Sequence, residues 1–105
     1  MGLFSLLFGN ANNSNTQLKE TIKEGAYLVD VRTPSEFASG SVVGAVNISL
    51  DSLSANISKF KNKKNIIVFC KSGGRSAQAK NILNQQGFQN VINGGTWQNV
   101  NSCMN

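Results

Sequence analysis

Short apolar runs alternate with helix-like segments along most of this chain. The runs at 27–31, 45–48, 66–69 and 91–92 predict four strands. The run at 66–69 is apolar at every position, which is typical of a parallel strand covered on both faces. Strands that alternate with helices on short connections predict an α/β fold with an open, mostly parallel sheet flanked by helices.

Capping signals place the first helix after a polar stretch. Ser14 with Gln17 predicts a capping box, Leu18 and Ile22 share one helical face, and Gly25 is a suitable stop. We therefore expect residues 1–14 to be an apolar tail and polar linker, 15–102 to form one domain, and 103–105 to be a C-terminal tail.

The later helices carry their own signals. The segment 33–36 (Thr-Pro-Ser-Glu) predicts a second capping box with proline at the first helical position, and its helix ends near Gly40. Asp51 predicts a helix start, 76–86 predicts a helix closed by glycine, and a glycine pair precedes a terminal helical segment. The core-facing residues expected in the Asp51 helix are Leu53, Ile57 and Phe60.

Composition excludes several mechanisms. The chain has 105 residues, enough for one domain, and its two cysteines, Cys70 and Cys103, are too few for a disulfide scaffold. We expect both thiols to be reduced, with a single bridge as the alternative. The chain has no histidine, which excludes a Ser-His-Asp triad, a Cys-His pair and imidazole metal ligands. No metal and no cofactor are expected.

The net charge of +5 is densest in a lysine run at 59–64. The run reads either as a solvated helix end or as a docking patch for acidic partners, and one aromatic residue gives little support for binding nucleic acid. The apolar segment Met1–Gly9 is too short to span a bilayer and lacks the features of a signal peptide. We expect this segment to be a tail, and the alternative is that it makes weak contact with a membrane or with another copy of the chain. A cytoplasmic location is the default expectation.

The segment Cys70-Lys71-Ser72-Gly73-Gly74-Arg75-Ser76 lies between the buried strand and a helix. A cysteine at a strand end is held in place, and we expect its sulfur to face outward. The two glycines allow the backbone N–H groups to turn inward as an anion-binding nest, and the helix start adds further unpaired N–H groups.

These features predict a stabilised thiolate at Cys70. Cysteines at helix N-termini or beside cations have pKa values of about 3.5–7.5, against about 8.5 for a free thiol. Lys71 and Arg75 add positive charge, and Arg75 can offer a planar fork to an oxyanion. The alternative is an inert buried thiol before a tight turn. The joint occurrence of cysteine, glycines and arginine in one strand-to-helix loop favours the functional reading.

The loop from Cys70 to Ser76 resembles the active-site loop of rhodanese-type sulfurtransferases. The resemblance extends from about Asn15 to Asn101. It includes Asp30-Val31-Arg32 followed by Glu36-Phe37, Gly44-Ala45-Val46-Asn47-Ile48, and Gly94-Gly95 with Trp97. The chain departs from the family pattern at Gly40-Ser41-Val42-Val43, where relatives often have Gly-His-Ile-Pro, and in the spacing of Trp97.

The resemblance implies a five-stranded parallel sheet and a persulfide on Cys70. The sulfur would come from thiosulfate or another small sulfur donor and pass to cyanide, a thiol or a protein thiol partner. The N–H groups from Lys71 to Arg75 would steady the persulfide. Asp30 and Arg32 read as a supporting ion pair rather than as catalysts, Glu36 as a capping residue, and Cys103 as a spare thiol that could reach the site only if the tail folds back.

Two other functions stay open. Cysteine phosphatases also hold an anion in a Cys-to-Arg loop, but they have five intervening residues where this chain has four. A persulfide carrier or partner-binding module would use the same cysteine without turning over small substrates.

Overall fold

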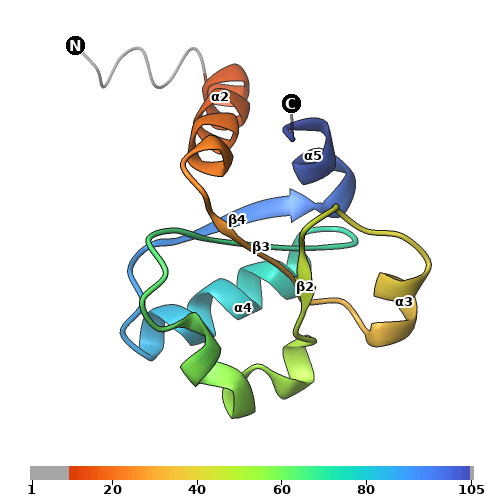
Figure 1. Cartoon of the computed structure of the whole chain (residues 1–105), viewed down its shortest axis with the longest axis vertical. Coiled ribbons are helices and arrows are strands. Elements are labelled where there is room, and N and C mark those ends of the chain that lie inside the picture. Colours follow the sequence, from red (N-terminus) through yellow and green to blue (C-terminus); the bar gives the residue numbers. More distant parts are fainter. Residues whose placement is uncertain (1–9, 105) are drawn as a thin grey trace.

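Four parallel strands form the centre of the part of the chain described by the structure, a computed structural model that covers residues 10–104 (Figure 1). They are β1 (Tyr27–Asp30), β2 (Val46–Asn47), β3 (Ile66–Cys70) and β4 (Val91–Thr96), in the order β2-β1-β3-β4. Because every neighbouring pair is parallel, the carboxyl ends of the strands share one edge of the sheet. The four strands predicted from the apolar runs are confirmed. The fifth strand implied by the resemblance is not found within residues 10–104.

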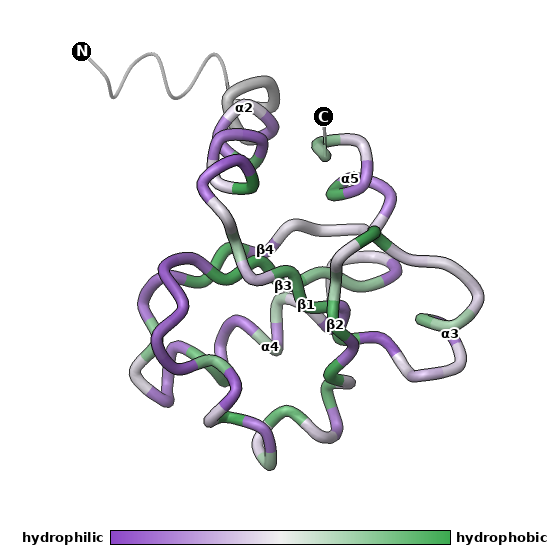
Figure 2. The backbone as a smooth tube through the Cα atoms, in the orientation of Figure 1, coloured by the Kyte–Doolittle hydropathy of each residue, from purple (hydrophilic) through white to green (hydrophobic). Residues whose placement is uncertain are grey.

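Helices cover both faces of the sheet. One face carries α4 (Gly74–Gln85) with the 3₁₀ segments η1 (Leu50–Ser52) and η2 (Ser54–Phe60), and the other carries α2 (Asn10–Lys23) and α5 (Trp97–Ser102) (Figure 1). The short helix α3 (Pro34–Ala38) follows β1 at the carboxyl edge. Figure 2 shows the most hydrophobic segments gathered in the strands at the centre of the molecule.

Strand β3 divides the core into two halves, because alternate side chains point to opposite faces. Ile66, Val68 and Cys70 belong to the core beneath α4, and Ile67 and Phe69 belong to the core beneath α2 and α5. All five residues are fully buried, as the continuous apolar run predicted.

The predicted start of the first helix is wrong. Helix α2 begins at Asn10, so Ser14 lies inside the helix and the stretch predicted as a linker is helical. Asn and Ser are only mildly unfavourable in a helix, and a helix anchored through Leu18 extends at little cost. Gly25 ends the first helical segment at φ +93°, as predicted. Met1–Gly9 lies outside the described residues.

Of the next two predicted helix starts, the structure confirms the one at Thr33 and contradicts the one at Asp51. The capping box at Thr33 and Glu36 is confirmed, with Pro34 in the first turn. Asp51 does not cap its helix, because it lies within η1 and Ser49 holds the capping position. The segment is 3₁₀ and kinked at Asn56, yet its predicted core residues are placed as expected: Leu53 and Phe60 are fully buried and Ile57 is partly buried.

No helix within residues 10–104 has both the length and the apolar character needed to cross a bilayer.

Candidate active site

Cys70 is the last residue of β3 and has no exposed surface. The expectation that its sulfur faces outward is therefore wrong. Alternation along β3 turns the side chain toward α4, and the loop that follows folds back over the sulfur. Lys71 and Ser72 are exposed on the outside of this loop.

Backbone N–H groups of the loop point at the Cys70 sulfur, as predicted. The N–H of Gly73 lies 3.0 Å from Sγ and the N–H of Ser76 lies 3.4 Å from it. Gly73 has φ +98°, a left-handed conformation that turns its N–H inward and that side-chain-bearing residues rarely adopt. It is also the N-cap of α4, so the helix starts at Gly74, two residues before the predicted start.

The surroundings of Cys70 lower its pKa. Burial of the thiol raises the pKa, but hydrogen bonding between the sulfur and the Ser76 hydroxyl, together with hydrogen bonds from the backbone N–H groups of Ser76, Gly73 and Ser72, outweighs that effect. In a chain without histidine, the donors of the loop thus favour the thiolate form of Cys70.

Ser76 is held by a residue that the sequence analysis did not select. Its hydroxyl donates to Asn93 Oδ1 at 2.7 Å, and Cys70 Sγ and the Gly73 carbonyl oxygen lie 3.5 Å and 3.1 Å from its oxygen. Asn93 reaches this position beside a β-bulge, since Val68 pairs with Asn93 but Phe69 pairs with Gly95. The glycine pair after Asn93 was the only sequence signal for such an irregularity.

The guanidinium of Arg75 is directed at a carboxylate of the protein itself. It forms a two-pronged ion pair with Glu36, with Nη1–Oε1 at 2.7 Å and Nη2–Oε2 at 3.1 Å. Glu36 is thus both the predicted capping residue of α3 and a partner of the loop. The hydrogen bond from Arg75, with the capping bond from Thr33, lowers the pKa of Glu36 to about 2.

Asp30 and Arg32 form the predicted ion pair beside the site. Both residues are buried, and Arg32 Nη2 lies 2.7 Å from Asp30 Oδ2. Asp30 also accepts from the Ser41 hydroxyl, and Arg32 donates to the Gly40 carbonyl. The Arg32 Cζ atom lies 5.3 Å from the centre of the Trp97 ring, so the tryptophan packs on the ion pair of Asp30 with Arg32.

Cys103 is not a tail residue. Helix α5 folds back over the sheet and buries Cys103 beside Phe69, on the face opposite Cys70. Both thiols are free. Since β3 separates the two sulfurs, Cys103 is not placed to resolve a species formed on Cys70. The described residues contain no group of three Cys, Asp or Glu side chains suited to a metal ion.

The lysine run lies far from Cys70. It precedes Ile66, the first residue of β3, whereas Cys70 is the last, about 13 Å away at roughly 3.3 Å per residue. Lys63 stacks on Tyr27 and Lys64 pairs loosely with Glu24, so part of the run has local partners.

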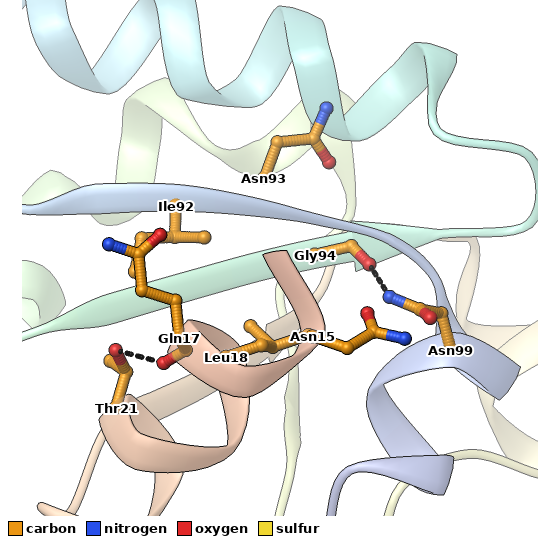
Figure 3. Close-up of a pocket in the computed structure, with 8 residues that line it drawn as sticks. All are labelled: Asn15, Gln17, Leu18, Thr21, Ile92, Asn93, Gly94 and Asn99. Atoms are coloured by element: carbon orange, nitrogen blue, oxygen red, sulfur yellow. Dashed lines mark hydrogen bonds between the residues drawn. The ribbon is translucent and has the colours of Figure 1, made fainter. Parts of the chain in front are cut away.

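Two pockets lie near the described site without containing its sulfur. The first, of about 170 Å³, adjoins the loop through Arg75, and its lining residues are Val31, Thr33, Ser49, Leu50, Asp51 and Arg75. The second, of about 260 Å³, lies between α2, β4 and α5 (Figure 3). It is lined by Asn15, Gln17, Leu18, Thr21, Ile92, Asn93, Gly94 and Asn99.

The fold and the loop define a class: a parallel α/β domain that presents a cysteine to N–H donors between a strand and a helix. Residues 14–97 match the family described as the Rhodanese-like domain, and the chain belongs to this family. The predicted rhodanese-like fold is thus confirmed.

Named relatives agree with the assignment. The chain is 36% identical over 70 residues to a sulfurtransferase of Allochromatium vinosum, a match that covers 67% of this chain and 65% of that protein. It is 35% identical over 74 residues to the thiosulfate sulfurtransferase PspE of Escherichia coli, covering 69% of this chain and 71% of that protein. A solved rhodanese with anions from E. coli superposes with a TM-score of 0.65 at 34% identity, covering 71% of this chain and 91% of that chain.

Proposed function

We propose that this chain is a sulfurtransferase that carries sulfane sulfur as a persulfide on Cys70. The observation that carries the proposal is the placement of the Gly73 and Ser76 N–H groups at 3.0 Å and 3.4 Å from Cys70 Sγ, in a chain without histidine. Such donors stabilise a thiolate and can steady the negative charge of a terminal persulfide sulfur. The relatives described as sulfurtransferases support the same reaction class.

The proposed reaction has two displacements. The Cys70 thiolate attacks the outer sulfur of thiosulfate, or of a persulfide donor, and the S–S bond breaks with its electron pair leaving on sulfite or on the donor thiolate. A thiol or cyanide then attacks the outer sulfur of the Cys70 persulfide, and the Cys70 thiolate leaves. The anion-binding loop consists of Lys71, Ser72, Gly73, Gly74, Arg75 and Ser76. Asp30 and Arg32 are supporting residues, and their ion pair holds the segment at Gly40 and Ser41.

Arg75 argues against the phosphatase alternative. In this structure its guanidinium is bound at both ends by Glu36 and is not free to hold phosphate oxygens beside Cys70. A persulfide carrier that serves a protein thiol uses the same loop and differs only in its acceptor.

Intact mass measurement after incubation with thiosulfate tests the proposal. Wild type and Cys103→Ser should gain the mass of one sulfur atom and lose it when cyanide is added, and Cys70→Ser should gain nothing. Equal loss of the adduct in both variants would contradict the assignment of Cys70. An adduct that forms but does not pass to cyanide or to small thiols would favour the carrier.

A further inference from the structure

The hydroxyl of Ser76 has one hydrogen and three acceptors within reach. They are Asn93 Oδ1 at 2.7 Å, the Gly73 carbonyl oxygen at 3.1 Å and Cys70 Sγ at 3.5 Å. A hydroxyl can donate only one hydrogen at full strength. The bond to Asn93 is the shortest, so in this arrangement the hydrogen points away from the sulfur.

The orientation of the Asn93 amide is fixed by a second donor. The N–H of Gly95 lies 2.9 Å from the same atom, Asn93 Oδ1, and a backbone N–H can only donate. The atom facing both groups is therefore the oxygen, and Ser76 must be the donor in its bond to Asn93. In Figure 3 the Asn93 side chain extends from β4 toward α4, away from the pocket beside Leu18.

We propose that Asn93 is a positioning residue that competes with the Cys70 sulfur for the hydroxyl hydrogen of Ser76. While Cys70 is a thiol, Ser76 donates to Asn93 and its oxygen can accept from the S–H. When Cys70 ionises, the hydroxyl rotates and donates to the thiolate. After this rotation Asn93 Oδ1 still accepts from the Gly95 N–H, so the amide oxygen keeps a hydrogen-bond donor when Ser76 turns away from it.

Asn93 therefore opposes formation of the thiolate that the Gly73 and Ser76 amides favour. The inference deepens the proposed function, since it concerns how readily the Cys70 nucleophile and its persulfide are stabilised. The charged groups around the loop are Arg75 of α4 with Glu36 of α3, Asp30 at the end of β1 with Arg32, and the exposed Lys71. Substitution of Asn93 by a neutral residue alters none of these charges.

The test is Asn93→Leu, which removes the acceptor at similar side-chain size. With Cys103 replaced by alanine in all proteins, the Cys70 pKa is read from the ultraviolet absorbance of the thiolate against pH and from alkylation rates. The Cys70 pKa should fall by about 0.5–1 unit. In the wild type, Ser76 must break its hydrogen bond to Asn93 before it can donate to the thiolate, and in the variant this cost is absent. In a Ser76→Ala background, Asn93→Leu should leave the pKa unchanged.

A pKa that rises or stays the same with Ser76 present would overturn the proposal, and so would an equal fall in both backgrounds. Thermal unfolding checks that each variant is folded, and Asn93→Ala replaces Asn93→Leu if the larger side chain prevents folding. The titration uses no sulfur donor. Failure of thiosulfate to load Cys70 would therefore count against the proposed function alone, and an unchanged pKa would count against the role of Asn93 alone.

Discussion

The ion pair of Glu36 with Arg75 connects α3 to the start of α4. Glu36 takes part in both this ion pair and the capping box of α3, since its carboxylate also accepts from the Thr33 backbone N–H. Both contacts favour the ionised carboxylate, which is why its pKa falls to about 2. The single residue thus ties the helix after β1 to the loop after β3.

Glu36→Gln should destabilise the fold at neutral pH, because glutamine can keep the capping box but cannot pair as an anion with Arg75. The folded-state pKa of Glu36 is depressed, so its ionic contribution is present above the unfolded value of about 4.3 and is lost as pH falls toward about 2. Urea unfolding at several pH values measures this. The stability difference between wild type and variant should be constant at neutral pH and shrink between about pH 4.5 and 2. A difference that does not depend on pH would mean that the pair contributes nothing.

Single-residue roles were predictable where they depended on local order along the chain. Cys70 ends a buried strand and Gly73 precedes the next helix, so N–H groups turned toward the sulfur could be expected. The bond from Ser76 to Asn93 joins residues 17 positions apart, and the pair of Arg75 with Glu36 joins residues 39 apart. Such contacts depend on strand order and on the β4 bulge, which the apolar pattern does not encode.

In the proposed mechanism, the loop between β3 and α4 limits the size of the group that the Cys70 sulfur can carry. Its turn depends on one left-handed glycine, Gly73, whose N–H faces the sulfur while the next residue begins the helix. With four residues between cysteine and arginine, the N–H groups converge on one atom. A phosphoryl group on the same sulfur would bring three oxygens and require a wider ring.

A glycine inserted between Gly73 and Gly74 should widen this ring and separate the sulfur from the start of α4. Sulfur transfer from thiosulfate to cyanide should fall by roughly 10²-fold, the loss typical of removing one donor that stabilises a developing anion. Arsenate or phosphate binding should be equal or stronger. Aryl phosphate hydrolysis by the unmodified protein that is lost in Cys70→Ser would contradict the size argument and favour a phosphatase.

Element types were easier to predict than element ends. The Thr33 capping box and the stop at Gly25 were correct because each depends on neighbours in sequence. Strand β4 extends through the glycine pair, four residues beyond the predicted end at Ile92, because pairing with β3 outweighs the weak strand preference of glycine. Helix α2 begins earlier than predicted for a similar reason, since its anchored half supports a polar extension.

At the scale of the molecule, α5 covers part of the sheet face opposite Cys70, and its Val100 packs closely against Gly94 of β4. A methyl group built on Gly94 would lie 2.6 Å from Val100 Cγ2 and 3.0 Å from Ile67 Cγ2. This close contact helps to hold a six-residue helix against the sheet, and the helix in turn buries Cys103, which was expected to lie in a C-terminal tail.

Gly94→Ala should therefore destabilise the protein by about 1–3 kcal/mol through overpacking between β4 and α5. Gly74→Ala is the matched control, because a methyl group there meets nothing within 4 Å and the backbone is already helical. Chemical denaturation of the two variants provides the comparison. Equal stability of both variants would show that α5 is not held tightly against the sheet.

The placement of the two cysteines on opposite faces of β3 has a consequence for turnover. The chain has only these two thiols, and a strand of the sheet lies between them. In the proposed mechanism, sulfur loaded on Cys70 has no second cysteine on its own face of β3 to attack it, so it persists until an outside nucleophile arrives. In that mechanism, the lifetime of the persulfide is set by the supply of an outside acceptor.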